Sequence, residues 1–188
     1  MYKKFFLSTL LFSLSLNYPT NLFAEIRSKI LQNLSNSETL KFDFEQTSLN
    51  SFETGICYIK RPHFLKCSYN DKRKKEIIVN KRTLVVLHYN KLRYSYPLSK
   101  SYFLEILDKK KFSDLAYKST LESDNESIKM KYLDEKKGSI IIYFNNKNYE
   151  LEGWEINDLT NNKTILKIKN LHKNEKIDNK IFFIPIPE

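Results

Sequence analysis

The central stretch of the sequence reads Phe52-Glu-Thr-Gly-Ile-Cys-Tyr-Ile-Lys-Arg-Pro-His-Phe-Leu-Lys-Cys-Ser-Tyr69. Two runs rich in aromatic and β-branched residues flank residues 60–63, a pattern typical of two antiparallel strands joined by a short turn. Pro62 has no N–H group to donate to a neighbouring strand, so we expect it in the turn itself. Arg61 then stands at the end of a strand, from where its long cationic side chain can reach another element.

The two cysteines of the chain fall within this hairpin. Cys57 and Cys67 lie at equal distances in sequence from Pro62, so a hairpin that turns there places them opposite each other. Opposed residues on neighbouring strands can satisfy the geometry of a disulfide, which an oxidising compartment would permit. Two buried thiols that act as small apolar residues are the alternative.

The N-terminus has the three-part pattern of a secretory signal peptide. Residues 1–4 are cationic, residues 5–16 are apolar, and a polar tail ends in the small residue Ala24. The apolar part is shorter than a comfortable membrane span. We therefore expect residues 1–24 to be a cleaved signal peptide and residues 25–188 to form one domain. An uncleaved N-terminal anchor is the alternative. With no cysteine close to the cleavage site, no lipid anchor is expected.

Composition narrows the classes of function. The 188 residues are 41% hydrophobic, which is enough for one domain with a core. Only three glycines are present, which excludes Gly-rich phosphate-binding loops. The net charge of +10 would suit nucleic acid, an anionic membrane or an acidic partner. The lysines are scattered, as on a solvated surface, and an exported protein is not expected to bind nucleic acid.

Periodicity outlines the remaining elements. Residues 25–34 place apolar side chains at helical spacing, and Leu40, Phe42 and Phe44 alternate with charged residues as in a strand. Two further short helices are expected around residues 102–107 and 112–116. Further strands are expected over residues 76–79, 83–89, 92–96, 127–133, 139–144, 149–159, 164–171 and 181–184.

This outline predicts a mainly β fold of the α+β class. An antiparallel sheet of so many strands does not stay flat, so it should curl into an unclosed barrel. The short amphipathic helices cannot bury their apolar faces alone and should cover the open side as a lid. The space between lid and sheet would be lined by apolar side chains, where a lipid tail can sit.

The sequence contains few patterns that would indicate a catalytic site. His63, His88 and His172 are far apart and lack the spacing of metal ligands, and no nucleophile-elbow motif is present. We therefore expect neither an enzyme nor a bound metal or cofactor. A secreted enzyme would need a site constellation that the sequence does not offer.

Several motifs resemble the outer-membrane lipoprotein carrier proteins, the LolA family. The hairpin supplies Gly55, then Tyr58-Ile-Lys-Arg-Pro62, then Leu65 and Tyr69. Leu40-Lys-Phe-Asp-Phe-Glu-Gln46 is similar to the early strand of the family. The later segments that follow the family in order are 76–79, 83–89, 151–158, 164–170, 177–178 and 181–185.

The resemblance implies an unclosed barrel with a lid of helices and a soluble carrier in the periplasm. Such proteins receive acylated lipoproteins from an inner-membrane ABC transporter and pass them to an outer-membrane receptor. We expect this one to act as a monomer. A sensing module on the same fold, which reads lipids or misplaced lipoproteins and signals to a membrane partner, is the alternative.

The resemblance also suggests site residues. Arg61, followed by Pro62, matches the family's arginine that latches the lid through hydrogen bonds to lid backbone; an arginine that merely caps a strand end is the alternative. Apolar residues of the strands and lid are candidates for the acyl-chain cavity, although plain core positions would look the same. These candidates are Phe42, Phe44, Tyr58, Leu65, Trp154, Ile30, Phe103 and Leu107.

Overall fold

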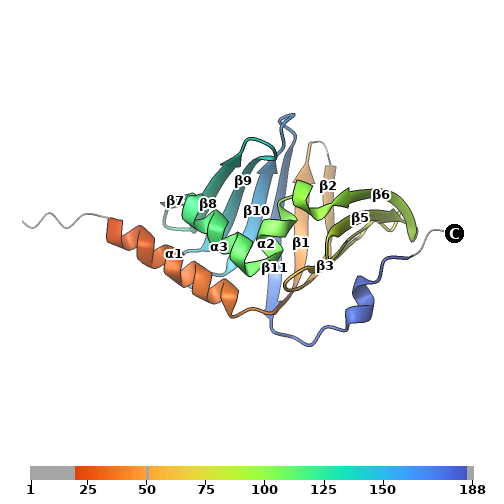
Figure 1. The fold of residues 1–188 in the computed structure, drawn as a ribbon, viewed down its shortest axis with the longest axis horizontal. Coiled ribbons are helices and arrows are strands. Elements are labelled where there is room, and N and C mark those ends of the chain that lie inside the picture. Colours follow the sequence, from red (N-terminus) through yellow and green to blue (C-terminus); the bar gives the residue numbers. More distant parts are fainter. Residues whose placement is uncertain (1–19, 50, 186–188) are drawn as a thin grey trace, which may run out of the picture.

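A computed structural model describes residues 20–49 and 51–185. In this part of the chain, eleven strands form one antiparallel sheet, and three α-helices lie against one of its faces (Figure 1). The strand order is β6-β5-β4-β3-β2-β1-β11-β10-β9-β8-β7, so the first and last strands of the order are free edges and the sheet is not closed. The predicted fold class, an unclosed and curved antiparallel sheet with short helices, is confirmed.

The strands mostly follow one another as hairpins. Among the described strands, only the pairing of β1 with β11 joins strands that are distant in sequence, and it places the first and last strands at the centre of the sheet. In chain order the strands are β1 (Thr39–Ser48), β2 (Ser51–Lys60), β3 (Phe64–Tyr69), β4 (Glu76–Asn80), β5 (Thr83–His88), β6 (Lys91–Pro97), β7 (Thr120–Ser123), β8 (Ser127–Asp134), β9 (Gly138–Asn145), β10 (Leu151–Asn157) and β11 (Lys163–Lys173).

The helices cover the sheet because each presents an apolar stripe to it. Helix α1 (Thr20–Ser35) buries Ile26, Ile30 and Leu34, one on each successive turn. Helix α2 (Phe103–Leu107) is followed at once by α3 (Lys109–Lys118), which begins where the Asp108 carboxylate accepts the Lys111 N–H at 2.9 Å. The side chains that α3 buries are Phe112, Leu115 and Ala116.

Helix α1 begins at Thr20, earlier than the residue 25 expected from periodicity. The predicted signal peptide, residues 1–24, therefore lies mainly outside the described residues, and its residues 20–24 form the first part of α1. None of the helices in the described ranges is long and apolar enough to span a membrane.

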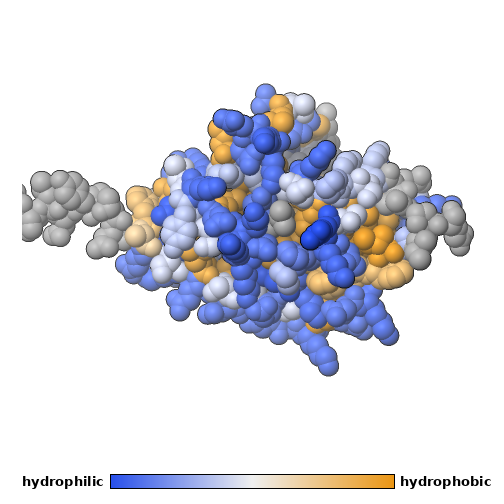
Figure 2. Space-filling view, viewed as in Figure 1, coloured by the Kyte–Doolittle hydropathy of each residue, from blue (hydrophilic) through white to orange (hydrophobic). Residues whose placement is uncertain are grey.

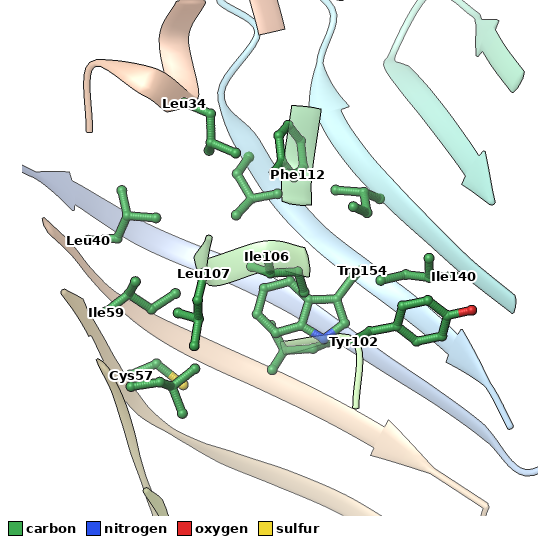
Figure 3. Packing of buried hydrophobic residues seen from close by; sticks show 14 of the residues in the cluster. Leu34, Leu40, Cys57, Ile59, Tyr102, Ile106, Leu107, Phe112, Ile140 and Trp154 are labelled. Atoms are coloured by element: carbon green, nitrogen blue, oxygen red, sulfur yellow. The ribbon is translucent and has the colours of Figure 1, made fainter. Parts of the chain in front are cut away.

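The core lies between the helices and the sheet (Figure 3). Strand β1 sends Leu40, Phe42 and Phe44 into it, as the alternation predicts. Gly55 on β2 lies opposite Phe44, and a Cβ there would meet the Phe44 ring at 2.7 Å and the Ser68 carbonyl oxygen at 2.2 Å. Only glycine therefore lets the Phe44 ring lie over β2.

The opposite face of the sheet, called here the outer face, carries a smaller apolar contact. The segment expected as a strand over residues 181–184 instead contains the 3-10 helix η2 (Asn179–Phe182), so that prediction was wrong. Strands β3 and β4, over which this segment passes, already have neighbours on both sides and offer no free edge. The Phe182 ring packs on Phe64, with ring centroids 5.5 Å apart. Ile184 packs on a cluster of three buried residues from β4 and β5: Ile78, Val85 and Leu87.

Candidate functional site

Arg61 occupies the turn between β2 and β3, beneath the helices. Its backbone N–H donates to the Glu38 carbonyl over 2.9 Å, which fixes the turn, and its side chain is only 6% exposed. One guanidinium nitrogen, Nη1, donates to the Leu34 carbonyl and, over 3.0 Å, to the Ser37 carbonyl. The other, Nη2, donates to the Ile106 carbonyl over 3.3 Å. A single side chain therefore ties the hairpin turn to the end of α1 and to α2.

The charge of Arg61 is balanced by dipoles rather than by an ion pair. Burial lowers the pKa of its guanidinium to about 10, while the negative charge of Glu38 acts in the opposite direction. Glu38 itself is exposed and pairs with Lys109. Of the accepting carbonyls, that of Leu34 lies in the last turn of α1 and that of Ile106 in α2, where helix carbonyls carry partial negative charge, and that of Ser37 lies just after α1. Among the described atoms, Arg61 Nε has no hydrogen-bond partner. These contacts can open without separating two full charges.

Solvent comes close to these contacts through a groove between α1 and α3. The groove has a volume of about 550 Å³ and includes Arg61 among its walls. Apolar side chains of both helices form part of its lining: Leu31, Leu34, Phe112 and Tyr117.

A second tie holds α2 at the other end of the site. Lys137, in the turn between β8 and β9, lies 2.6 Å from the Glu105 carboxylate, and both side chains are mostly buried. Next to them the Tyr102 hydroxyl donates to the Gly138 carbonyl over 2.7 Å. Sequence reasoning missed this pair because Lys137 and Glu105 belong to distant segments and neither has a recognisable motif.

The apolar candidates gather on the helix-covered face of the sheet. Trp154 on β10 lies between two phenylalanine rings, with centroids 6.3 Å from Phe42 and 6.3 Å from Phe103, both edge to face. Phe103 is half-buried. The candidates that are at most 2% exposed are Phe42, Phe44, Leu65, Trp154, Ile30 and Leu107. The helices and the sheet thus enclose a packed apolar layer, and an acyl chain would reach it only if the helices move.

Tyr58 does not belong to this layer. Cys57 and Ile59, its neighbours on β2, are buried on the helix-covered face, so Tyr58 points to the outer face and is only half-buried. It lies between Lys41 and Lys66 on the adjacent strands. Strand alternation places this candidate on the face of the sheet opposite the helices.

The two cysteines lie directly opposite each other on β2 and β3. Their sulfur atoms are bonded, with Cα atoms 4.1 Å apart. Both side chains face the core, where Cys57 lies near Ile59 and Leu107 (Figure 3).

The described residues contain no group of three or more His, Cys, Asp or Glu side chains that could hold a metal ion. His63, His88 and His172 lie in separate elements: the β2–β3 turn, β5 and β11.

Comparison with known proteins agrees with this geometry. The profile of the family described as outer membrane lipoprotein carrier protein LolA matches residues 35–185, most of the chain. This protein belongs to the LolA family. A search of curated proteins found no match.

Several solved structures are similar to this LolA-family protein at low sequence identity. An uncharacterized conserved protein from Thermus thermophilus has a TM-score of 0.56 and 10% identity, with 86% of this chain and 93% of that chain covered. MucB has a TM-score of 0.50 and 9% identity, with 87% of this chain and 62% of that chain covered. The lipoprotein LppX of Mycobacterium tuberculosis has a TM-score of 0.49 and 12% identity, with 86% and 100% covered.

Proposed function

We propose that this LolA-family protein is a soluble carrier in the periplasm, which binds the acyl chains of lipoproteins and acts as a monomer. It would receive them from an inner-membrane ABC transporter and pass them to an outer-membrane receptor. The observation that carries the proposal is the set of hydrogen bonds from Arg61 to the Leu34, Ser37 and Ile106 carbonyls. These bonds hold the end of α1 and helix α2 against the sheet, and breaking them would let the helices move away from it.

The energetics of such a carrier fit these contacts. Exposing an acyl chain to water costs about 0.8 kcal/mol per CH₂, so a carrier must cover the chain during transit. It must also release the chain at the receptor, so the cover must not be held too tightly. A hydrogen bond from a charged group contributes about 1.5–3 kcal/mol net. A few such bonds can be broken in exchange for the burial of an acyl chain between α2 and the sheet.

The exposed start of α1 supports export with cleavage after Ala24. Leu22 and Phe23 are exposed, as are Ala24 and Glu25, and Ile26 is the first buried side chain in the part of α1 whose burial is described, residues 22–35. Removal of Leu22, Phe23 and Ala24 would therefore take nothing from the core. The proposal contains no chemical step and needs no catalytic residue, metal or cofactor.

A release assay tests the proposal. Inner-membrane vesicles that contain the cognate transporter and a labelled acylated lipoprotein are mixed with the exported protein and ATP. A soluble complex of lipoprotein and protein is expected. Arg61→Leu should change either uptake or transfer to the receptor, whereas Tyr58→Leu, on the outer face, should change neither. Absence of a soluble complex with an active transporter would overturn the proposal.

Depletion in the cell separates the carrier from the sensing alternative, a periplasmic module that reads lipids or misplaced lipoproteins. The fold shared with MucB is compatible with either, and this chain covers only 62% of MucB. Lipoproteins retained at the inner membrane would support the carrier. A changed stress response with correctly sorted lipoproteins would support the sensor.

A further inference from the structure

The strands are arranged so that five hairpins turn at the same rim of the sheet. They are β5–β6, β3–β4, β1–β2, β10–β11 and β8–β9, and each lies beside the next in the strand order. Figure 1 shows the β1–β2, β10–β11 and β8–β9 hairpins ending together at the upper edge of the sheet. We call this edge the hairpin rim. The turns between consecutive hairpins, such as Pro62–His63 between β2 and β3, lie at the opposite rim.

Large apolar side chains project from the hairpin rim. Four of the five hairpins carry at least one at the turn or next to it, and each is more than half exposed. In the space-filling view, orange apolar groups stand among blue polar ones along the same upper edge (Figure 2). The residues are Leu49, Phe52, Tyr89, Leu133 and Leu159.

The opposite rim is different. Its turns, within the described residues, cover 61–63, 81–82, 124–126 and 146–150, and none of the largely exposed apolar side chains lies in them. Exposed leucines scattered singly over a protein surface would need no explanation. Here they are concentrated at the tips of neighbouring hairpins at one end of the sheet.

Two of these residues have a backbone conformation with positive φ, which is unfavourable for their residue types. Leu49 has φ +47° and Tyr89 has φ +52°. This left-handed region is unfavourable for bulky residues, and turns usually place Asn or Gly there. Neither side chain gains burial in return, since Leu49 is 74% exposed and Tyr89 is 54% exposed. The folded chain alone thus gives no reason for Leu49 and Tyr89 at these positions.

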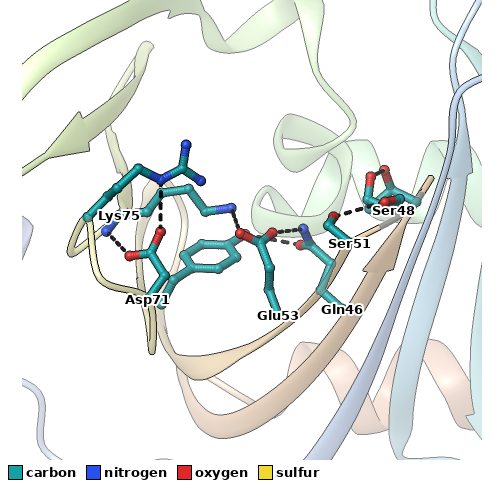
Figure 4. Close-up of polar contacts among 9 residues, drawn as sticks. Gln46, Ser48, Ser51, Glu53, Asp71 and Lys75 are labelled. Carbon is teal, nitrogen blue, oxygen red and sulfur yellow. Dashed lines mark hydrogen bonds and ion pairs between the residues drawn. The ribbon is translucent and has the colours of Figure 1, made fainter.

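A chain of polar contacts holds part of the rim together (Figure 4). The Ser48 hydroxyl lies 2.9 Å from the Thr164 hydroxyl, which joins the β1–β2 and β10–β11 hairpins. The Tyr69 hydroxyl donates to Gln46 Oε1 over 3.0 Å, and Gln46 Nε2 donates to Glu53 over 3.2 Å. Lys75 then pairs with Glu53. The tips of three hairpins are therefore held in fixed positions beside one another.

The net positive charge of the protein comes from the segment that includes strands β3 to β6. Residues 60–100 contain twelve Lys and Arg but only two acidic residues, and this surplus of ten equals the net charge of the whole chain. The segment supplies basic residues to both rims, including Lys81 and Arg82 at the opposite rim. The β3–β4 turn contributes four successive basic residues, 72–75, and touches the next hairpin through the Tyr89 N–H, which donates to the Arg73 carbonyl over 2.9 Å. Lys72 and Lys74 are exposed and have no acidic partner within the described residues.

We propose that the hairpin rim docks onto the surface of an anionic lipid bilayer. Tips of neighbouring hairpins are spaced by about 10 Å, two strand spacings, so the apolar groups do not form the contiguous packed patch that a protein interface needs. A bilayer interface accepts separate apolar and tyrosine side chains, while nearby lysines meet the anionic headgroups. This inference goes beyond the carrier proposal and holds whether or not the protein carries lipoproteins.

Flotation with protein-free vesicles tests the docking. The exported protein is mixed with phosphatidylcholine vesicles that contain or lack phosphatidylglycerol, at low and high salt. We expect binding to the anionic vesicles that weakens with salt. Leu49→Asn and Leu159→Asn should each reduce the affinity by about tenfold, since each removes one partly inserted leucine. Leu49→Asn should keep or raise the melting temperature, because Asn tolerates positive φ, so lost binding would not reflect unfolding.

Matched variants locate the effect. Lys72→Glu with Lys74→Glu should abolish the preference for phosphatidylglycerol, whereas Lys81→Glu with Arg82→Glu, the same charge change on the opposite rim, should leave most of it. Phe183→Asn, an equally exposed apolar residue away from the rim, should have no effect. All variants share one N-terminus, so any binding by that segment is common to all. Equal loss in the two charge variants, or binding only to native membranes that contain proteins, would overturn the proposal.

Discussion

The Arg61 guanidinium donates to the Ile106 carbonyl over 3.3 Å, from a hairpin turn on the sheet to helix α2 above it. The same side chain binds the Leu34 and Ser37 carbonyls at the end of α1. The sheet and two of its covering helices therefore meet at one buried cation. This contact is the obvious place to loosen the cover without disturbing the sheet.

Replacing Arg61 should loosen the helices locally. Arg61→Leu leaves three carbonyls without their donor, which should lower the free energy of unfolding by about 1–3 kcal/mol after relief of the charge burial. Hydrogen exchange should become faster in α2 and at the end of α1, but not in the β8–β9 hairpin. Arg61→Lys keeps a charge but not the forked geometry, so its effect should be smaller. A uniform change over the whole chain would contradict a local latch.

The two faces of the sheet can be compared with a pair of aromatic substitutions. Phe42→Ala removes a ring that is 1% exposed and packed on Trp154, so it should cost about 3–5 kcal/mol of stability and weaken acyl-chain binding. Tyr58→Ala, on the outer face, should cost much less and leave acyl-chain binding unchanged. Chemical denaturation and displacement of a fluorescent fatty acid measure the two effects. Equal effects of both variants on binding would argue against a site under the helices.

Trp154 offers an internal reporter of the cover. It is the only tryptophan of the chain, is 2% exposed, and lies between Phe42 and Phe103. Binding of an acylated peptide should change its emission because the neighbouring rings must move. Arg61→Leu should make the residue more accessible to acrylamide quenching. An emission that stays constant when a ligand is shown to bind would place the ligand elsewhere.

Reduction of the bond between Cys57 and Cys67 should destabilise the β2–β3 hairpin. Closing so short a loop is worth about 2–3 kcal/mol by the chain-entropy estimate. The melting temperature should fall on addition of a reductant, and the Cys57→Ala, Cys67→Ala double variant should be insensitive to it. Mass spectrometry after alkylation without reduction checks the bond in the exported protein. Two alkylated cysteines would show that the pair is not bonded there.

Asp158 should titrate far below an ordinary aspartate. Its carboxylate accepts hydrogen bonds from the backbone and side chain of Asn162 and from Thr160, and these hold its pKa at about 2 instead of 3.8. Because the folded pKa is the lower one, this stabilisation is complete above pH 3.8 and is lost as the pH falls through about 2. The amide signals of the β10–β11 turn should follow the same transition in NMR. Asp158→Asn should remove it.

Much of the fold could be predicted because its signals are local. Alternation along β1, the turn at Pro62 and the helical spacing in α1 each depend on residues a few positions apart. One predicted strand was wrong because a local signal was overruled. The apolar segment 181–184 had no strand edge to pair with and packs as η2 over the outer face. Tyr58 is aromatic like its neighbours in the core, but the strand phase set by Cys57 and Ile59 turns it outward.

The sequence by itself determined most of the elements, the family and the position of Arg61 at a strand end, since these follow from residue types at short spacing. Only the tertiary structure decided which carbonyls Arg61 binds, that Lys137 meets Glu105, and that the exposed apolar side chains of neighbouring hairpins share one rim. Those relations depend on the pairing of β1 with β11 and on the packing of α2 against the sheet. Both are contacts between segments distant in sequence, and local patterns do not encode which distant segments meet.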